Sequence, residues 1–171
     1  MSSHKHLIIN TFCLLIIGIS LTACGYQPLH GKRTTALNTE MQDELAQIWI
    51  YEIKDRAGQQ LHNELLTLFN TKGRPQQPKY KLRISYNEST IRSSISKDEF
   101  ATRATLDINA QFILSGPINL TGKSQSVVSY NILTSPTGTE FAERDARARA
   151  IKNIALDIHR RIAVHFLNAK K

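Results

Sequence analysis

Cysteine, glycine and long hydrophobic runs are all scarce in this sequence. Its 171 residues include 2 cysteines and 8 glycines, and none of the glycines forms a phosphate-binding loop motif. A membrane-spanning helix needs ~20 apolar residues. The apolar run from Leu7 to Leu21 is shorter than that, and it is interrupted by Asn10, Thr11, Gly18 and Ser20. These absences argue against a nucleotide-binding loop and against a membrane-spanning helix.

The N-terminus has instead the segment order of a signal peptide. A polar start with one cation, Lys5, precedes the apolar run, which ends at Leu21-Thr22-Ala23-Cys24. Signal peptides need a positive start, a short apolar core and small residues at the cut. The tetrapeptide resembles a lipobox, whose cysteine thiol receives diacylglycerol. We predict that residues 1–23 are a lipoprotein signal peptide and that Cys24 carries lipid, with an ordinary secretory signal or an uncleaved anchor as the alternatives.

Lipid at Cys24 would fix the mature protein to a membrane. Each buried methylene contributes ~0.8 kcal/mol, so two or more acyl chains hold a protein where one would not. Gly25 follows the cysteine, whereas Asp at that position tends to retain well-studied lipoproteins in the inner membrane. The expected location is the outer membrane, on its periplasmic side.

The mature chain is basic and has no cysteine chemistry left. Cleavage removes Lys5 and no acid, so 21 of the 22 Lys and Arg remain against 14 Asp and Glu, a net charge of +7. Cys13 leaves with the signal peptide and Cys24 is acylated, which excludes an intramolecular disulfide, a cysteine metal site and a thiol nucleophile. The domain must be stabilised by a packed core.

The mature sequence predicts a tether and one domain. Residues 24–46 show no sustained periodicity and indicate a lipidated, flexible tether, while residues 47–171 form a single periplasmic domain. Residues 48–53 are β-branched and aromatic, which is typical of a short strand. Asp55 can cap the helix that follows, whose apolar face holds Leu61, Leu65, Leu68 and Phe69 before Gly73 and Pro75 end it.

Three alternating runs and a final helix complete the pattern. Apolar residues occupy the even positions of 79–86 and 104–114, and the run 126–134 places Val128, Tyr130 and Ile132 on one face. Three consecutive strands of this kind predict an antiparallel meander. Thr137 and Glu140 have capping-box spacing. The last helix then carries an apolar stripe of Ala148, Ile151, Ala155, Ile158 and Ile162. The order β-α-β-β-β-α predicts an α+β two-layer sandwich, with two helices on one face of an antiparallel or mixed sheet of about four strands.

Catalytic and metal-binding patterns do not stand out. The histidines of the domain, His62, His159 and His165, are scattered along the predicted helices, whereas a metal site needs several convergent donors. No nucleophile with a base and no paired carboxylates are evident. We expect no catalytic residues, no metal, no cofactor and no enzymatic activity.

Cations gather in the predicted loop between the first two alternating runs. Arg92, Lys97 and Arg103 lie close to the isolated apolar residues Ile91, Ile95 and Phe100. Cations beside exposed apolar groups suit an amphipathic anion, because phosphates pair with Arg or Lys while acyl chains meet the apolar side chains. The alternative is a solvated face on a flexible loop.

Several short segments together resemble a known family. They are Gly25-Tyr26-Gln27-Pro28-Leu29 after the lipobox, the stretch 53–61 with Asn63-Glu64-Leu65, Ala101-Thr102-Arg103, Ser129-Tyr130-Asn131 and the Ala/Arg-rich final helix. Their order and spacing resemble the lipopolysaccharide-assembly lipoprotein family, LptE, in its alphaproteobacterial form, over nearly the whole mature chain.

The resemblance implies a role in transport without catalysis. Members of the family sit as a plug inside the outer-membrane β-barrel translocon LptD, and help it to fold and to deliver lipopolysaccharide. The implied partners are that barrel, lipopolysaccharide and the membrane, with no nucleic acid. We expect Arg92, Lys97 and Arg103 to contact lipopolysaccharide. The alternatives are an auxiliary lipoprotein of another envelope transport system, an envelope scaffold and, third, an envelope hydrolase.

Overall fold

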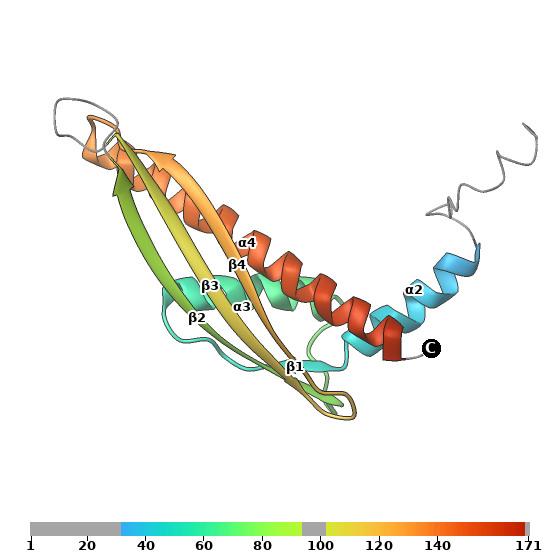
Figure 1. Ribbon diagram of the computed structural model, residues 1–171. Coiled ribbons are helices and arrows are strands. Elements are labelled where there is room, and N and C mark those ends of the chain that lie inside the picture. Colours follow the sequence, from blue (N-terminus) through green and yellow to red (C-terminus); the bar gives the residue numbers. More distant parts are fainter. Residues whose placement is uncertain (1–31, 94–101, 170–171) are drawn as a thin grey trace, which may run out of the picture. The chain divides into compact units, whose positions relative to one another are not determined.

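The structure is a computed structural model that describes residues 32–93 and 102–169 (Figure 1). Two compact units divide the chain, 1–37 and 38–171, and of the first unit only the opening of helix α2 (Lys32–Leu45) is described. The predicted signal peptide, Cys24 and Lys97 therefore lie outside the described residues. No helix in the described ranges is both long enough and apolar enough to cross a membrane.

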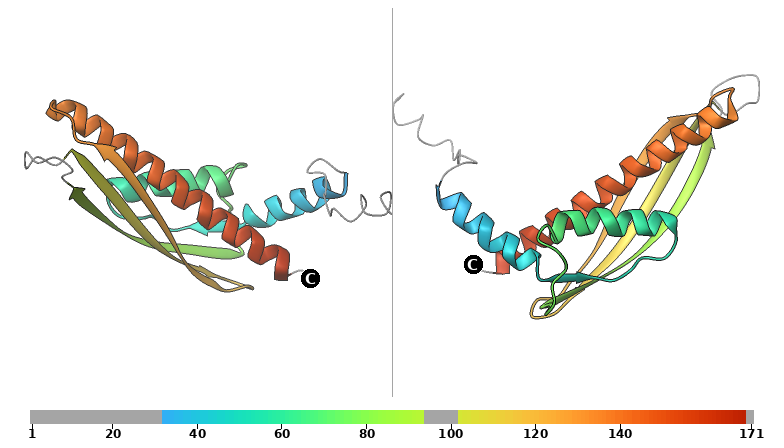
Figure 2. Two further views of the ribbon diagram at one scale, coloured as in Figure 1. Left: turned by 45° about the horizontal axis from the view of Figure 1, so that its top comes forward. Right: turned by 180° about the vertical axis from the view of Figure 1, so that it is seen from behind.

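The second unit is built on a four-stranded mixed sheet. Its strands β1 (Ile48–Ile50), β2 (Tyr80–Ser93), β3 (Arg103–Ser115) and β4 (Leu120–Asn131) lie side by side in chain order. β1 is parallel to β2, while β2, β3 and β4 form an antiparallel meander. Helices α3 (Arg56–Phe69) and α4 (Pro136–Ala169) both lie on one face of the sheet (Figures 1 and 2). The predicted α+β two-layer fold is confirmed.

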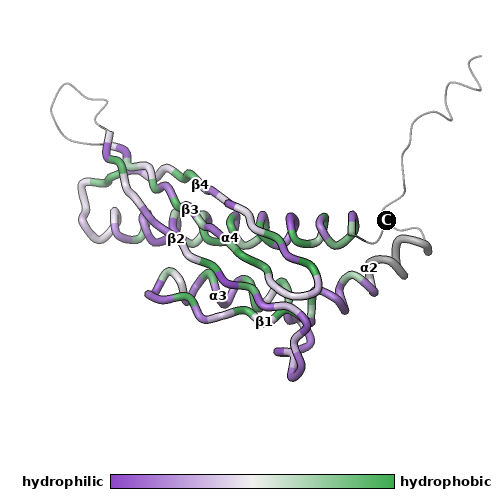
Figure 3. The backbone as a smooth tube through the Cα atoms, turned by 60° about the horizontal axis from the view of Figure 1, so that its bottom comes forward, coloured by the Kyte–Doolittle hydropathy of each residue, from purple (hydrophilic) through white to green (hydrophobic). Residues whose placement is uncertain are grey.

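The core lies between that inner face of the sheet and the two helices. The even-numbered residues of β3, from Ala104 to Leu114, are all 0–1% exposed. Opposite Phe112 stands Gly122, where a Cβ would come within 2.4 Å of the Phe112 ring, so glycine is needed to admit it. α4 alternates between apolar and polar residues along its coil (Figure 3). Its buried residues are Ala146, Ala150, Ile151, Ile154, Ala155, Ile158, Ile162, Ala163 and Phe166.

The two helices differ in how much of the sheet they cover. With 34 residues α4 is about 51 Å long, whereas the 14 residues of α3 extend about 21 Å. β2 and β3, at 14 and 13 residues, run for roughly 45 Å. We call the end where β2 finishes and β3 begins the hairpin end. There the inner face of β2 loses its cover, because Tyr80, Leu82 and Ile84 are buried whereas Thr90 and Arg92 are exposed.

The predicted tether is wrong for its last part. Residues Lys32–Leu45 form helix α2, and Leu45 is only 3% exposed within the core. The Tyr80 hydroxyl donates to Glu44 Oε1 at 2.8 Å, and Lys72 Nζ lies 2.9 Å from Asp43 Oδ1. Met41 also packs against the core, one turn before Leu45. This i, i+4 apolar pair is the helical pattern that the tether prediction overlooked.

The predicted polar loop is also shorter than expected. β2 continues to Ser93, in register with β3 down to the pair Ser93 and Arg103. β4 likewise starts at Leu120, six residues before the predicted start. Backbone pairing with β3 sustains these strands where side-chain alternation of polarity is lost, as it is in 87–93 and 121–126.

Helix starts differ in detail from the prediction. Ser135, not Thr137, caps α4, since its Oγ accepts the Gly138 N–H at 3.4 Å. Glu140 pairs instead with Arg144, one turn on. Asp55 does stand at the N-cap of α3, but it has φ 70° and no side-chain capping hydrogen bond. Ala148 is exposed, and Ala146 and Ala150 take its place in the buried stripe.

Leu45→Ala tests whether α2 belongs to the domain. Truncating a buried leucine leaves a cavity, and we expect the free energy of unfolding to fall by about 2–4 kcal/mol. Urea unfolding followed by circular dichroism measures it. Gln42→Ala, on an exposed position of the same helix, should change stability by less than ~0.5 kcal/mol. Equal, small effects of both substitutions would show that the end of α2 is not part of the core.

Alkaline titration tests the contact between α2 and β2. Burial and the Glu44 carboxylate raise the pKa of Tyr80 from 10.0 to about 12. The phenol thus ionises in the unfolded chain first, so the stability it contributes is present below pH 10 and is lost as pH rises from 10 toward 12. Thermal unfolding across this range should show a smaller loss for Tyr80→Phe than for the wild type. Identical pH profiles would contradict the assignment.

Candidate functional site

Two hollows open at the hairpin end, on the helix side of the sheet. The first is a charged cleft of about 460 Å³ between the start of α3, the inner face of β2 and the first turns of α4. The second is an apolar hollow of about 860 Å³ where β4 runs into α4. The start of α3 lines the first hollow, whereas no residue of α3 lines the second.

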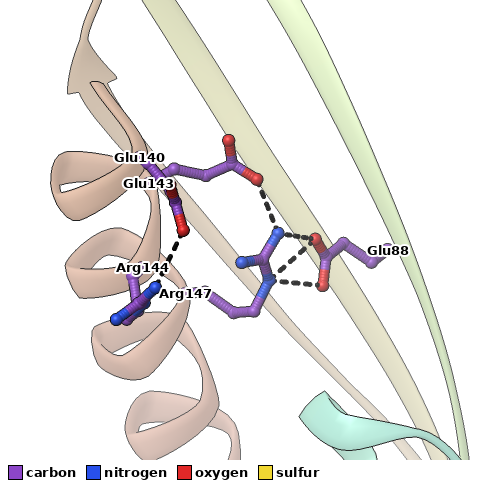
Figure 4. A network of polar contacts seen from close by, with 5 residues as sticks. All are labelled: Glu88, Glu140, Glu143, Arg144 and Arg147. Carbon is purple, nitrogen blue, oxygen red and sulfur yellow. Dashed lines mark hydrogen bonds and ion pairs between the residues drawn. The ribbon is translucent and has the colours of Figure 1, made fainter. Parts of the chain in front are cut away.

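Arg147 organises the charged cleft (Figure 4). Its Nε lies 3.0 Å from Glu88 Oε1 and 3.1 Å from Oε2, and its Nη2 lies 2.8 Å from Glu88 Oε1 and 2.7 Å from Glu143 Oε1. The side chains of Arg147 and Glu88 are 27% and 22% exposed. An Arg that pairs with both oxygens of a carboxylate is held in a fixed plane. The pair therefore fixes α4 to β2 where the inner face of β2 no longer carries buried apolar residues.

The electrostatics of the cleft follow from this arrangement. Hydrogen bonds to Glu88 and then Glu143 raise the pKa of Arg147 against the opposing effect of burial. Burial, and the neighbouring Glu143 carboxylate that accepts from its hydroxyl, raise the pKa of Tyr130. Arg147 and Tyr130 thus stay protonated at neutral pH, and both donate to Glu143. The cleft is a fixed ion-pair network in which the cation is already partnered.

The second hollow is mainly apolar, and one cation stands among the described residues of its lining. Its apolar walls come from the end of β4 and the residues after it, Tyr130, Ile132, Leu133 and Pro136, together with three threonines. Leu133 is 50% exposed. Arg92 of β2 completes the lining. A hollow of this kind can take an apolar chain while its cation pairs with an anionic group on the same molecule.

The structure separates the cations that the sequence placed together. Arg92 stands opposite Ala104, which is buried on the inner face, so its side chain lies on the helix side of the sheet. Arg103 occupies an odd position of β3 and lies on the other side. Lys97, Ile95 and Phe100 are outside the described residues. The predicted cluster therefore contributes Arg92 to the hollow, and Arg103 does not share that face.

Sequence reasoning missed the other members of both hollows. Glu88 continues the even positions of β2 after Tyr86, and an acid on the inner face of a strand indicates a buried partner. That pattern could have pointed to Arg147. The apolar hollow left no comparable trace, because Leu133 and Pro136 lie after the strand. In the part of the chain with described coordinates, no three His, Cys, Asp or Glu residues gather to hold a metal ion.

Glu88→Gln tests the ion-pair network. It leaves Arg147 half-buried with one carboxylate instead of two, and we expect the free energy of unfolding to fall by about 1–3 kcal/mol. Glu140→Gln is the matched control, because Glu140 also pairs with an Arg of α4 but is 70% exposed, and exposed pairs contribute at most ~1 kcal/mol. Chemical denaturation measures both variants. If Glu140→Gln lowers the free energy of unfolding as much as Glu88→Gln does, Glu88 does not have the proposed role of bridging β2 and α4.

Solved structures of bacterial lipoproteins share this fold. One, a candidate lipoprotein from Caulobacter crescentus, aligns with a TM-score of 0.63 at 21% identity, over 74% of this chain and 95% of its own. Rare lipoprotein B from Shewanella oneidensis aligns at 0.59 and 10% identity, over 72% and 98%. A minor lipoprotein from Acinetobacter baumannii aligns at 0.56 and 16% identity, over 70% and 92%.

By sequence, neither a protein-family model nor a curated protein matches the chain. At these identities the likeness extends to the fold alone. The second unit of this chain thus has the two-layer fold of several bacterial lipoproteins, nearly complete over their lengths.

Proposed function

We propose that this chain is an outer-membrane lipoprotein that binds lipopolysaccharide and assists assembly of the β-barrel translocon that delivers it to the cell surface. The observation that carries the proposal is the apolar hollow with Arg92 at its lining, on a fold shared with bacterial lipoproteins. The role needs contact alone, and the proposal assigns no catalytic group.

The membrane anchor supports the proposed location. Leu21-Thr22-Ala23-Cys24 resembles a lipobox, and proteins with the same fold are described as lipoproteins. Acyl chains on Cys24 would hold the domain at the membrane surface. Residues 25–37 separate the lipid from the second unit, which begins at Asn38. The domain would then work close to the bilayer that carries its ligand.

The hollow at the hairpin end suits an amphipathic phosphorylated lipid. An acyl chain lying against Ile132, Leu133 and Pro136 would gain ~0.8 kcal/mol for each buried methylene. Arg92, at the lining of the same hollow, has the fork of N–H donors that matches a phosphate. Arg147 is committed to Glu88 and Glu143, which leaves Arg92 as the cation for the ligand. Lys97, close to Arg92 in sequence, is assigned the same role.

The barrel partner rests on the family resemblance. The segments 25–29, 53–61 and 129–131, which resemble LptE, lie in different parts of the chain. An auxiliary lipoprotein of another envelope transport system, or an envelope scaffold, would use the same fold and anchor. A pull-down from membranes with the tagged full chain separates these functions, because only the proposed function requires an LptD-like barrel as the main partner.

Arg92→Ala tests the ligand site against a matched control. Arg92 lines the apolar hollow, whereas Arg103 lies at the same end on the opposite face of the sheet. We expect Arg92→Ala to weaken lipopolysaccharide binding by about tenfold or more, since a charge-assisted contact contributes ~1.5–3 kcal/mol. Arg103→Ala, the matched control, should bind as the wild type does. The triple variant, which adds Lys97→Ala and Arg103→Ala to Arg92→Ala, should bind no better than Arg92→Ala alone. Unchanged binding by the triple variant refutes the site.

Depletion in cells tests the function itself. Loss of the protein should lower both surface lipopolysaccharide and the amount of correctly folded translocon. A plasmid copy of the wild type should restore both, whereas Cys24→Ser, which cannot be acylated, should restore neither. Normal surface lipopolysaccharide after depletion would contradict the proposal.

A further inference from the structure

The outer face of the sheet is uncovered by any described helix and is polar at its centre. Two rows of side chains cross it from β2 to β4, with Asn87, Asn109 and Gln125 in one and Ser85, Gln111 and Lys123 in the next. All six side chains are exposed. Figure 1 shows the strands curving along their length, with both helices behind them. These rows line a hollow of about 860 Å³.

Amides dominate this hollow, and some of them are already oriented. Asp107 accepts hydrogen bonds at 3.0 Å from Asn109 Nδ2 and Gln125 Nε2. Because their nitrogens are engaged, both amides direct carbonyl oxygens elsewhere as acceptors. Asn87 and Gln111 make no side-chain hydrogen bond within the described ranges. The hollow thus offers both donors and acceptors, which is what a surface of hydroxyl groups requires.

The rim of the hollow is positive. Lys123 on β4 lines it. Arg160 and Arg161 also line it, from α4 on the other face of the sheet, past the edge strand β4. Asp157 is the one acid among the described residues of the lining. Both arginines pair with that single carboxylate, at 2.8 and 2.7 Å. Asp107 lies beside the rows and accepts from Asn109 and Gln125, so three cations stand against two acids in and next to the hollow, which leaves a net positive charge. An anionic ligand complements this charge.

Exposed apolar groups lie outside the two rows. Ile113 (47% exposed) flanks them in the row of Arg83 and Thr121, and Val127 (58% exposed) flanks them beside Asp107. The polar rows keep these side chains apart, so they form no continuous apolar patch for a protein partner or an acyl chain. Each can still contact the C–H face of a single sugar ring.

We propose that the central rows of the outer face bind an acidic oligosaccharide, with its hydroxyls on the amides of Asn87, Asn109, Gln111 and Gln125 and its phosphate or carboxylate beside Lys123. This choice of ligand rests on the proposed function. The acidic oligosaccharide is the sugar portion of lipopolysaccharide, whose acyl portion is proposed to bind in the apolar hollow. The two portions then contact opposite faces of the sheet.

Calorimetric titration tests this inference with the full lipidated chain in detergent micelles. The probe is phosphate-bearing core oligosaccharide from which all acyl chains have been removed. We expect the double variant Asn87→Ala/Gln111→Ala to weaken its binding about tenfold. The control Ser115→Ala/Thr121→Ala, on the same face but outside the rows, should bind as the wild type does. Circular dichroism verifies that each variant is folded.

Two further measurements separate the outcomes. Lys123→Ala should weaken binding of the phosphate-bearing oligosaccharide, yet leave binding of an oligosaccharide without phosphate or carboxylate groups unchanged. Chemical-shift changes in the wild type should fall on Gln111 and Gln125, and changes confined to the helix side would overturn the inference. No binding of the oligosaccharide also overturns it but leaves the proposed function standing, provided that intact lipopolysaccharide still binds. Loss of both ligands would contradict the proposed function.

Discussion

The packing of α4 along the inner face of β3 and β4 is the interaction on which the rest of this domain depends. Every even-numbered residue of β3 from Ala104 to Leu114 is buried. Small residues of β4, Gly122, Ser124 and Ser126, lie on that same face. The strands can therefore run for 12 to 14 residues and stay paired to their ends. A shorter helix would leave the meander without a core at the hairpin end.

The difference in length between α4 and α3 shapes the candidate site. Where α3 no longer reaches, β2 cannot carry apolar residues inward, and it carries Glu88, Thr90 and Arg92 instead. Glu88 is neutralised by Arg147, which ties the uncovered strand to α4. Arg92 is left at the lining of an apolar hollow. In the proposed function this uncovered end holds the phosphorylated lipid, and the opposite, amide-rich face of the same sheet meets its sugars.

The sequence predicted the layers well and the site only in part. Strict alternation in 79–86 and 104–114 identified the inner face correctly, because a buried face tolerates few polar residues. The same alternation did not predict the second half of β2, beyond Asn87. There the strand is held by backbone pairing with β3 and carries no alternating apolar residues. Helix α2 was missed because Met41 and Leu45 form a single i, i+4 pair within a polar segment. The sequence groups Arg92 with Arg103 because both lie near isolated apolar residues, but the two lie on opposite faces of the sheet. Their separation required the register of β2 with β3.

Photo-crosslinking in cells tests most directly whether the hairpin end holds lipopolysaccharide. A benzoylphenylalanine at Leu133, half-exposed in the apolar hollow, should capture lipopolysaccharide on irradiation. The same group at Thr67, on an exposed position of α3, should not. Capture at Thr67 alone, or at neither position while the protein is folded and anchored, would contradict the account.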